Sequence, residues 1–340
     1  MALLGVCSVV AFLLVKQSDL LYQPSPGGIS RRLKDNPPGM RSPEEYAIRH
    51  EVVSNLSTAD GVRLSAWLLF AKASPKHAPT LIYMHGNAGN IGHRLQLFSK
   101  MHDHLEANIL ALEWRGFGDS EGKPSEPGLV QDALAALKWL SSHNKINPDR
   151  IFLFGTSLGG AVSIALASQP DVKIAGLICE NSFTCVSDMG CVSFPFLLPF
   201  RPLLVPPILQ NEWPSIRCVA NVKVPLLFLC GSNDAIVPPQ HSSELHDAAV
   251  SAKSKSLHVF HGGGHNDLYM SGNLYFSLIQ DFLNKQSKDH AATLDNNASH
   301  EFVPRLQPTL FRFRDRENAA DDLILNENNN DPDDDDVEVD

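Results

Sequence analysis

The sequence predicts an α/β fold with a mostly parallel central sheet and helices on both of its faces. Between residues 51 and 286, short apolar runs typical of buried strands alternate with segments of helical periodicity. The apolar fraction of 43% is enough for a sizeable core, and one domain of this length is common among α/β folds. A serine between two glycines directly after one apolar run is the third observation, because a strand-to-helix turn that carries a nucleophile has this form.

The expected elements alternate along the chain. Apolar runs predict strands at Thr80–Met84, Asn108–Leu112, Ile151–Phe154, Gly176–Cys179, Pro225–Cys230 and Leu257–Phe260. Helical periodicity predicts helices at Arg94–Leu105, Gly128–Ser141, Leu158–Ser168, Gln240–Ala249 and Gly272–Lys285. Because parallel strands need such crossover helices between them, this alternation supports a doubly covered sheet.

Ser157 lies between a predicted strand and a predicted helix in the sequence IFLFGTSLGG, which spans residues 151–160. The turn between the two elements must be sharp, and Gly155 and Gly159 remove the Cβ atoms that would clash there. We expect Ser157 to adopt a strained backbone conformation that presents its hydroxyl. Ser157 is therefore the candidate nucleophile.

A serine nucleophile needs a histidine as general base and an acid that orients the histidine. Asp234 follows a predicted strand in the sequence GSNDAIVPP, and His265 follows the last predicted strand in HGGGHND. The chain order Ser157, Asp234, His265 is the order that α/β hydrolases use, and it differs from the orders of chymotrypsin and subtilisin.

Two of these assignments have rivals. Glu180 also ends a predicted strand at the same edge of the sheet, so it is the alternative to Asp234 as the acid. Among fourteen histidines, the closest rivals of His265 are His85, His93, His258 and His261. His265 is preferred because the three glycines before it let its loop reach back over the sheet edge. Asp267 is expected to help order that loop.

Acyl transfer develops negative charge on an oxygen, and backbone N–H groups that form an oxyanion hole stabilise this charge. The amide of Leu158, directly after the nucleophile, is the first expected donor. The loop HGNAGNIGHR after an earlier strand supplies the second donor, from Asn87 or Ala88. Asn90 in the same loop is also a candidate N-cap of the following helix, and the two roles are compatible.

Six motifs occur in one order: HGNAGNIGHR, EWRGFGDSEGKPSE, FGTSLGGAV, ENSF, SNDAIVPP and GGGHND. Together they resemble the α/β-hydrolase superfamily, and specifically a membrane-anchored group of bud-emergence-type α/β hydrolase domain-containing proteins. The resemblance covers about Glu51–Gln286 and also includes an apolar N-terminal segment. It implies a triad of Ser157, Asp234 and His265 and an uncleaved anchor. Many relatives carry Arg where this chain has Thr156, which leaves the triad intact but puts a substrate contact of such an Arg in doubt.

The segment at about residues 182–221 interrupts the regular pattern. It contains FPFLLPFRPLLVPPILQNEW, and proline at this density does not permit a long helix. One interpretation is a short apolar lid over the active site that suits an acyl chain; the other is a peripheral packing layer or a membrane-contacting surface.

In the motif RGFGDSEG, Arg115 is expected to pair with a backbone or carboxylate group rather than with substrate.

Both ends of the chain lie outside the expected domain. Residues 1–22 begin with an apolar run that predicts a membrane anchor, although the run is shorter than the ~20 residues of a comfortable span. Residues 23–50 are expected to form a linker. Residues 287–340 are expected to be a disordered acidic tail, because twelve acidic residues and one arginine between residues 315 and 340 account for the net charge of −10.

The orientation of the anchor is open. Basic residues after the apolar run favour a cytoplasmic domain: Lys16, Arg31, Arg32 and Lys34. The signal-anchor arrangement implied by the resemblance places the domain outside the cell or in a lumen. Asn55 and Asn297 would be glycosylation acceptors in the second arrangement.

Other function classes leave no signature. The five cysteines of the domain region form no CxxC pair, so a zinc site is not expected and one disulfide near the lid is the most that their spacing allows. The sequence has no phosphate-binding glycine motif in a nucleotide-binding context and no basic aromatic stripe, so a nucleotide cofactor or a nucleic-acid partner is not expected.

The sequence therefore predicts a membrane-anchored serine hydrolase that cleaves carboxylic esters or thioesters without a metal or organic cofactor. Its expected substrate is a small-molecule or lipid-like acyl compound. A serine peptidase on the same triad is one alternative, disfavoured because the chain has no propeller or large cap. A non-catalytic hydrolase fold used for interaction is the other, disfavoured because every triad residue is present.

Overall fold

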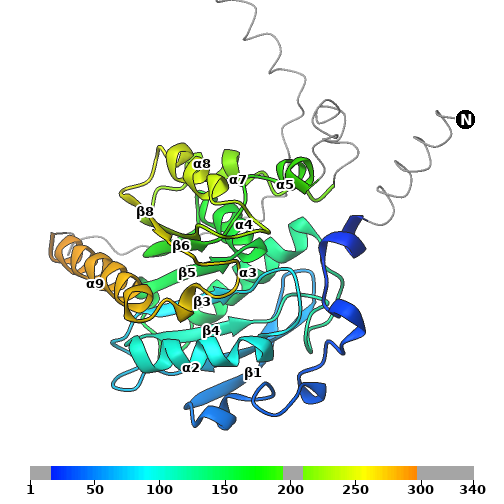
Figure 1. Ribbon diagram of the computed structural model, residues 1–340. Coiled ribbons are helices and arrows are strands. Elements are labelled where there is room, and N and C mark those ends of the chain that lie inside the picture. Colours follow the sequence, from blue (N-terminus) through cyan, green and yellow to red (C-terminus); the bar gives the residue numbers. More distant parts are fainter. Residues whose placement is uncertain (1–16, 194–209, 297–340) are drawn as a thin grey trace, which may run out of the picture. The chain divides into compact units, whose positions relative to one another are not determined.

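A mixed sheet lies between two layers of helices in the computed structural model, which describes residues 17–193 and 210–296 (Figure 1). The sheet has eight strands in the order β1-β2-β4-β3-β5-β6-β7-β8. The pairs β1–β2 and β2–β4 are antiparallel, and every other neighbouring pair is parallel. The predicted α/β fold with a mostly parallel sheet is confirmed.

The strands are β1 His50–Ser57, β2 Arg63–Leu69, β3 Thr80–Met84, β4 Asn108–Leu112, β5 Ile151–Thr156, β6 Gly176–Glu180, β7 Leu226–Gly231 and β8 Lys255–Phe260. The helices are α2 Leu95–His104, α3 Glu126–Ser141, α4 Leu158–Ala167, α5 Val186–Ser193, α7 Ser215–Cys218, α8 Gln240–Ala248 and α9 Asn273–Asn296. Short 3₁₀ helices are η1 Pro26–Gly28, η2 Leu33–Asp35, η3 Pro43–Tyr46, η4 Ile91–Arg94, η5 Pro148–Arg150, η7 Val219–Asn221 and η8 Leu268–Met270. All six predicted strands are present, with small shifts at their ends.

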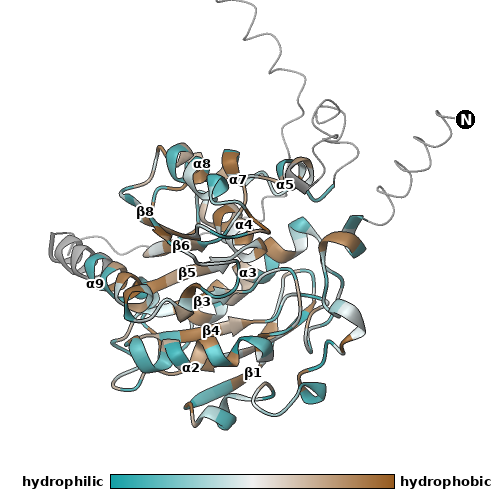
Figure 2. Cartoon of the chain, in the orientation of Figure 1, coloured by the Kyte–Doolittle hydropathy of each residue, from teal (hydrophilic) through white to brown (hydrophobic). Residues whose placement is uncertain are grey.

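The sheet has an apolar core on each face. One core joins the strands to α3, α4 and α8, and the other joins them to α2 and α9. Figure 2 shows the same division, since the strands at the centre are apolar while α2 and α9 turn polar surfaces outward. The central strands β3, β4, β5, β6 and β7 are buried along their whole length. Burial on both faces explains why these strands read as continuous apolar runs in the sequence.

The strands β1 and β2 were not predicted. In β1 most side chains are exposed or half-buried, and only two of its eight positions are buried. β1 lies at the edge of the sheet, where one face and one edge meet solvent, so its sequence lacks a continuous apolar run. The helix α3 also begins before the predicted Gly128, because Ser125 caps it by accepting a hydrogen bond from the Gly128 N–H.

The segment 23–50, expected to be a linker, packs on the domain. Leu33 and Ile48 are buried in the core that α2 and α9 share. Gln23 forms a parallel β-bridge with Ala88, and Asn36 donates a hydrogen bond of 2.9 Å to Asn90 Oδ1. The expectation is corrected because proline and polar residues here form short 3₁₀ helices and tertiary hydrogen bonds, which carry no periodic signal.

Several predictions concern residues outside the described ranges: most of the anchor segment (1–16), the centre of the lid (194–209) and the tail from 297 onward, with Asn297. Helix α9 itself continues past 286 to Asn296. In the part of the chain that the structure describes, no helix is both long and apolar enough to cross a membrane. Asn55 is exposed on β1, where its Oδ1 accepts a hydrogen bond from the Trp139 indole.

The cysteines do not form the disulfide that their spacing left open. Within the described ranges the thiols of five residues are free: Cys179, Cys185, Cys191, Cys218 and Cys230. Burial raises the pKa of the Cys185 thiol to about 11, which keeps it protonated and unreactive at neutral pH.

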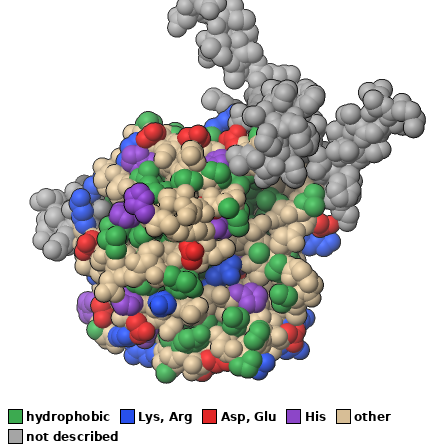
Figure 3. Space-filling model, viewed as in Figure 1, with side chains coloured by type: hydrophobic (Ala, Val, Ile, Leu, Met, Phe, Trp, Pro, Cys, Tyr) green, Lys and Arg blue, Asp and Glu red, His purple; other side chains and the backbone are tan. Residues whose placement is uncertain are grey.

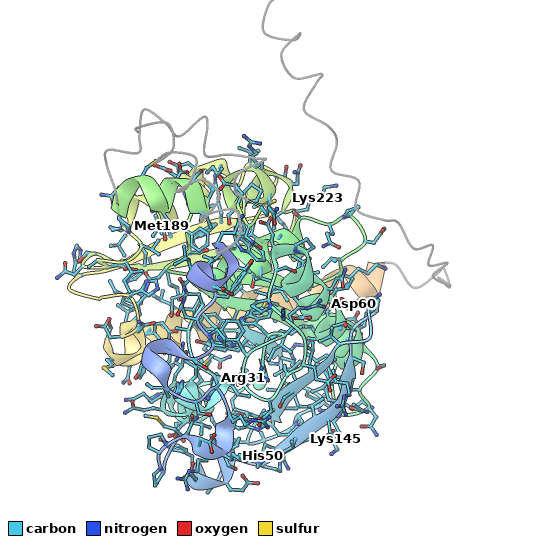
Figure 4. All side chains as sticks on the ribbon, turned by 90° about the vertical axis from the view of Figure 1, so that its right-hand side faces the viewer. Arg31, His50, Asp60, Lys145, Met189 and Lys223 are labelled. Carbon is cyan, nitrogen blue, oxygen red and sulfur yellow. The ribbon has the colours of Figure 1, made fainter. Side chains whose placement is uncertain are left out.

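Arg115 is paired as the sequence predicts. Its Nε donates to Asp132 Oδ1 at 2.8 Å, and its two terminal nitrogens donate to Asp60 at 2.7 and 3.0 Å. Figure 4 labels Asp60. The Asp132 side chain is fully buried, whereas that of Asp60 is 43% exposed. Arg115 is thus a structural cation that joins α3 to the turn between β1 and β2.

The change Asp132→Asn is expected to lower the free energy of unfolding by about 3 kcal/mol, because it leaves the Arg115 guanidinium without its buried counter-charge. Asp60→Asn is the matched control, with an expected loss below about 1 kcal/mol, since solvent screens the exposed carboxylate. Urea unfolding of both variants measures the difference. Equal losses would contradict the structural role assigned to the buried partner.

Candidate active site

Ser157 occupies a strained turn between β5 and α4. Its backbone angles are φ 55° and ψ −117°, a conformation that costs a non-glycine residue about 1–3 kcal/mol. A Cβ on Gly155 would collide with the Gly159 backbone, and a Cβ on Gly159 would collide with the Met84 carbonyl. The Ser157 N–H donates to Glu180 O at 2.8 Å, which ties the turn to the end of β6. The strain expected from the sequence is present.

His265 and Asp234 form a short hydrogen bond. The distance between His265 Nδ1 and Asp234 Oδ2 is 2.6 Å, and the Asp234 side chain is fully buried. The other carboxylate oxygen of Asp234 accepts the N–H groups of Ile236 and Val237, each at 2.8 Å. The carboxylate is thereby fixed in one orientation, and it holds the imidazole with Nε2 free for another partner.

The loop that carries His265 is held by two side chains. Asp267 Oδ1 accepts the Gly264 N–H at 2.6 Å, as expected for a residue that orders the loop. Asn181 donates from Nδ2 to the carbonyls of Gly264 and His265, at 3.1 and 3.0 Å, and accepts the Gly231 N–H at 3.0 Å. Asn181 therefore fastens the His265 loop to the ends of β6 and β7.

Sequence reasoning gave no role to Asn181. It follows β6 directly and has φ 46°, a left-handed conformation that asparagine tolerates better than most residues. An asparagine at the carboxyl end of a buried strand was the signal available in the sequence.

Glu180, the rival acid, lines the same cavity, but its carboxyl hydrogen-bonds with Tyr275 and Thr156 and not with His265. It accepts a hydrogen bond of 2.6 Å from the Tyr275 hydroxyl at Oε2, and Thr156 Oγ1 lies 3.4 Å from Oε1. Burial raises the pKa of Glu180 to about 7, and the Tyr275 hydrogen bond and the charge of His265 oppose this rise only in part. The structure thus pairs Asp234, and not Glu180, with the histidine.

The buried carboxyl of Glu180 predicts a pH-dependent stability. Between its ordinary pKa of 4.5 and about 7, the folded protein keeps a proton that the unfolded chain releases, so stability falls as the pH rises through this window. The loss is expected to reach about 3 kcal/mol above pH 7. Urea unfolding at pH 5 and pH 8 measures this change. The free energy of unfolding should fall more between these pH values for the wild type than for Glu180→Gln, and equal falls would contradict the role of the Glu180 carboxyl.

The expected oxyanion loop lies against the candidate nucleophile. An ideal Cβ on Gly86 would lie 3.6 Å from Ser157 Cβ, so the loop after β3 touches the turn after β5. The residues before η1 hold this loop: the Gln23 N–H donates to Asn87 O at 2.8 Å, and the Asn87 side chain donates to Leu21 O at 2.9 Å. Leu158 begins α4 directly after Ser157. Asn90 caps η4, as expected for the second role of this loop.

These residues share one cavity of about 630 Å³. Ser157, Leu158, Asn87 and His265 all line it, and Asp234 lies behind His265. Most of the remaining wall is apolar: Leu21, Pro26, Ile29, Leu97, Phe183, Val186, Met189, Ile236 and Val237. Phe183, Val186 and Met189, which is labelled in Figure 4, belong to the N-terminal part of the expected lid.

The rest of the molecule offers no competing centre among residues 17–193 and 210–296. This part of the chain contains no group of three or more metal-ligating side chains that could hold an ion. His85 is completely buried and faces Glu113, with 3.5 Å between Nε2 and Oε2. On the visible face in Figure 3, acidic and basic side chains are interspersed with apolar ones.

Comparison with known proteins places the chain in a family. The model of the prolyl oligopeptidase family matches residues 125–290. The alpha/beta hydrolase domain-containing protein WAV2 of Arabidopsis thaliana is 37% identical over 84% of this chain and 92% of its own length. The chain belongs to the α/β-hydrolase superfamily. Protein bem46 of Schizosaccharomyces pombe, 36% identical over 81% of this chain and 88% of its own length, confirms the expected resemblance to the bud-emergence-type group.

A lipase is among the sequence relatives, and an esterase is among the solved structures of similar fold. A lysophosphatidylserine lipase of Danio rerio is 29% identical over 72% of this chain and 72% of its own length. An esterase of Pyrococcus furiosus has a TM-score of 0.58 at 22% identity, covering 72% of this chain and 94% of the esterase. The structural likeness shows the α/β-hydrolase fold, which confirms the fold class that the sequence predicts.

Proposed function

We propose that the protein is a serine hydrolase in which Ser157, His265 and Asp234 form the catalytic triad. The hydrogen bond between His265 and the buried Asp234, at the wall of the cavity that also contains the strained Ser157, is the observation that carries this proposal. His265 Nε2 would take the proton of the Ser157 hydroxyl as its oxygen attacks the substrate carbonyl, and would then protonate the leaving group. Asp234 would hold the imidazole in the required tautomer and stabilise its charged form.

The N–H groups of Leu158 and Asn87 are the proposed oxyanion donors. Leu158 follows the nucleophile at the start of α4, and Asn87 lies on the loop that touches Ser157 through Gly86. Two donors fixed by the backbone need no reorganisation as the negative charge develops, and each contributes about 3 kcal/mol to transition-state stabilisation in such sites. Water would then attack the acyl-enzyme with His265 as the base, and His265 would return the proton to the Ser157 oxygen as the acid is released.

The proposed substrates are carboxylic esters or thioesters with an apolar acyl group. Apolar side chains form most of the cavity wall beside Ser157, and three of them come from the first part of the expected lid. We also propose that the apolar run at the start of residues 1–22 anchors the protein in a membrane. The end of this range belongs to the domain instead, because Tyr22 is buried in the core and Leu21 lines the cavity. An anchored domain would meet acyl substrates at the lipid surface.

A panel of p-nitrophenyl esters of rising acyl length tests this substrate class on the full chain. We expect kcat/KM to rise from the acetyl ester to esters of about eight carbons, because the apolar wall gains contact with each methylene. His265→Ala is the control for background hydrolysis. A preference for the acetyl ester would contradict the apolar acyl site, and a folded protein that cleaves no ester would favour the non-catalytic alternative.

A peptidase is the second candidate function, because the family model that matches residues 125–290 is that of the prolyl oligopeptidases. The same triad would cleave either an ester bond or a peptide bond. Aminoacyl p-nitroanilides compared with aminoacyl p-nitrophenyl esters of the same residue separate the two: we expect cleavage of the esters alone beyond the background of His265→Ala. Efficient cleavage of the anilides would favour the peptidase.

A further inference from the structure

Arg94 lies in the wall of the active-site cavity. It is the last residue of η4, and it lines the same cavity as Ser157 and His265. Its Nη2 donates a hydrogen bond of 3.1 Å to the carbonyl of Ala88. Ala88 follows Asn87, the proposed second oxyanion donor. The guanidinium is therefore held beside the loop that faces the carbonyl of a bound substrate.

Arg94 has no acidic partner among the residues that the structure describes, where every ion pair closer than 4.0 Å involves another cation. Arg115 provides the contrast, since Asp60 and Asp132 satisfy its guanidinium. A guanidinium has five N–H donors, and the contacts to the Ala88 carbonyl and the Tyr83 hydroxyl use only some of them. Arg94 thus keeps donors for a further acceptor.

The other ionisable groups of the cavity wall do not cancel this charge. Glu180 is the one acidic residue among the described lining residues; it is 5% exposed, and Tyr275 and Thr156 contact its carboxyl. Burial raises the pKa of Glu180 to about 7, so a large part of it is uncharged at neutral pH. Burial lowers the pKa of His93, and the charge of Arg94 lowers it further. The His93 imidazole is therefore neutral at neutral pH. Arg94 is therefore a cation of the cavity wall that no neighbouring carboxylate pairs directly.

We propose that Arg94 is a specificity-determining residue that binds an anionic group of the substrate, a carboxylate or a phosphate. The inference rests on the proposed esterase function and narrows its substrates to acyl esters that carry a negative charge close to the scissile bond. The planar fork of a guanidinium matches both anions, because each offers two oxygens at the spacing of its N–H groups. The apolar wall would receive the acyl chain, and Arg94 would receive the charge.

Two matched pairs of substrates test the proposal and separate the two sources of charge. Mono-p-nitrophenyl glutarate against p-nitrophenyl pentanoate places a carboxylate on the acyl side. A monoacylglycerol phosphate against the corresponding monoacylglycerol, both below their critical micelle concentrations, places a phosphate on the alcohol side. The full chain is compared with Arg94→Gln and with Arg94→Lys, which retains the charge without the fork. Arg31→Gln is the matched control, since Arg31 donates to the carbonyls of Gly116 and Ser120 and does not line the cavity.

We expect the wild type to prefer the anionic member of at least one pair. Arg94→Gln should lower kcat/KM for that ester by about 10- to 100-fold, mainly through KM, and change the neutral ester by less than about threefold. Arg94→Lys should keep part of the preference, and Arg31→Gln all of it. Two outcomes would overturn the inference but leave the esterase function standing. The wild type could hydrolyse both members of each pair equally well, or Arg94→Gln could lose kcat/KM equally on all four esters. A folded wild type that cleaves none of them would contradict the proposed function and the inference together.

Discussion

Ser157→Ala is expected to lower kcat for p-nitrophenyl ester hydrolysis by about 10⁴- to 10⁶-fold, because the hydroxyl that would form the acyl-enzyme is lost. The fold should persist, since alanine places the same Cβ in the strained turn and the N–H to Glu180 remains. Initial rates with a chromogenic ester measure the loss, and circular dichroism checks the fold.

Ser163→Ala is the matched control for this change. Ser163 lies six residues further along the chain, within α4, where its hydroxyl donates to Gly159 O at 2.7 Å, and it does not line the cavity. Its replacement should leave kcat within about threefold of the wild type. If Ser157→Ala kept more than a tenth of the wild-type kcat, another residue would have to be the nucleophile.

Asp234→Asn is expected to lower kcat by about 10⁴-fold, because the amide cannot hold the imidazole in the tautomer that accepts the proton from serine. The 2.6 Å bond between Asp234 and His265 is the contact that this change disturbs. Kinetics with the same chromogenic ester at pH 7 to 9 measure the loss.

Glu180→Gln is the matched control, since it removes the other carboxyl at this end of the sheet. The Glu180 side chain contacts Tyr275 and Thr156 rather than the histidine, so its loss should cost less than about tenfold in kcat. A large loss in Glu180→Gln with a small one in Asp234→Asn would show that the acid is misassigned.

The buried strands and the order of the site residues could be predicted from the sequence. Buried parallel strands such as β3 and β5 appear as continuous apolar runs, and the glycines around Ser157 leave only one kind of turn sterically possible. Asp234 follows the buried strand β7 and His265 follows the edge strand β8, where only Phe260 is buried. Both strands are parallel to their neighbours, so the place of these residues at one edge of the sheet followed from topology.

Contacts that depend on tertiary structure could not be predicted. The linker expected at 23–50 packs on the proposed oxyanion loop through backbone hydrogen bonds of Gln23 and side-chain hydrogen bonds of Asn36, which leave no pattern in the sequence. Asn181 and Arg94 gain their roles only when β6, β7 and the loop after β3 come together. The half-exposed strand β1 lacked the apolar run that would have marked it.

Labelling with a fluorophosphonate probe tests the central claim most directly, because the probe modifies only a serine that its own site activates. The full chain is treated with the probe and digested, and the modified peptide is identified by mass spectrometry. We predict one modified residue, Ser157, with no labelling in His265→Ala and weak labelling in Asp234→Asn. A folded wild-type protein that takes no label, or that takes it at another serine, would contradict the account.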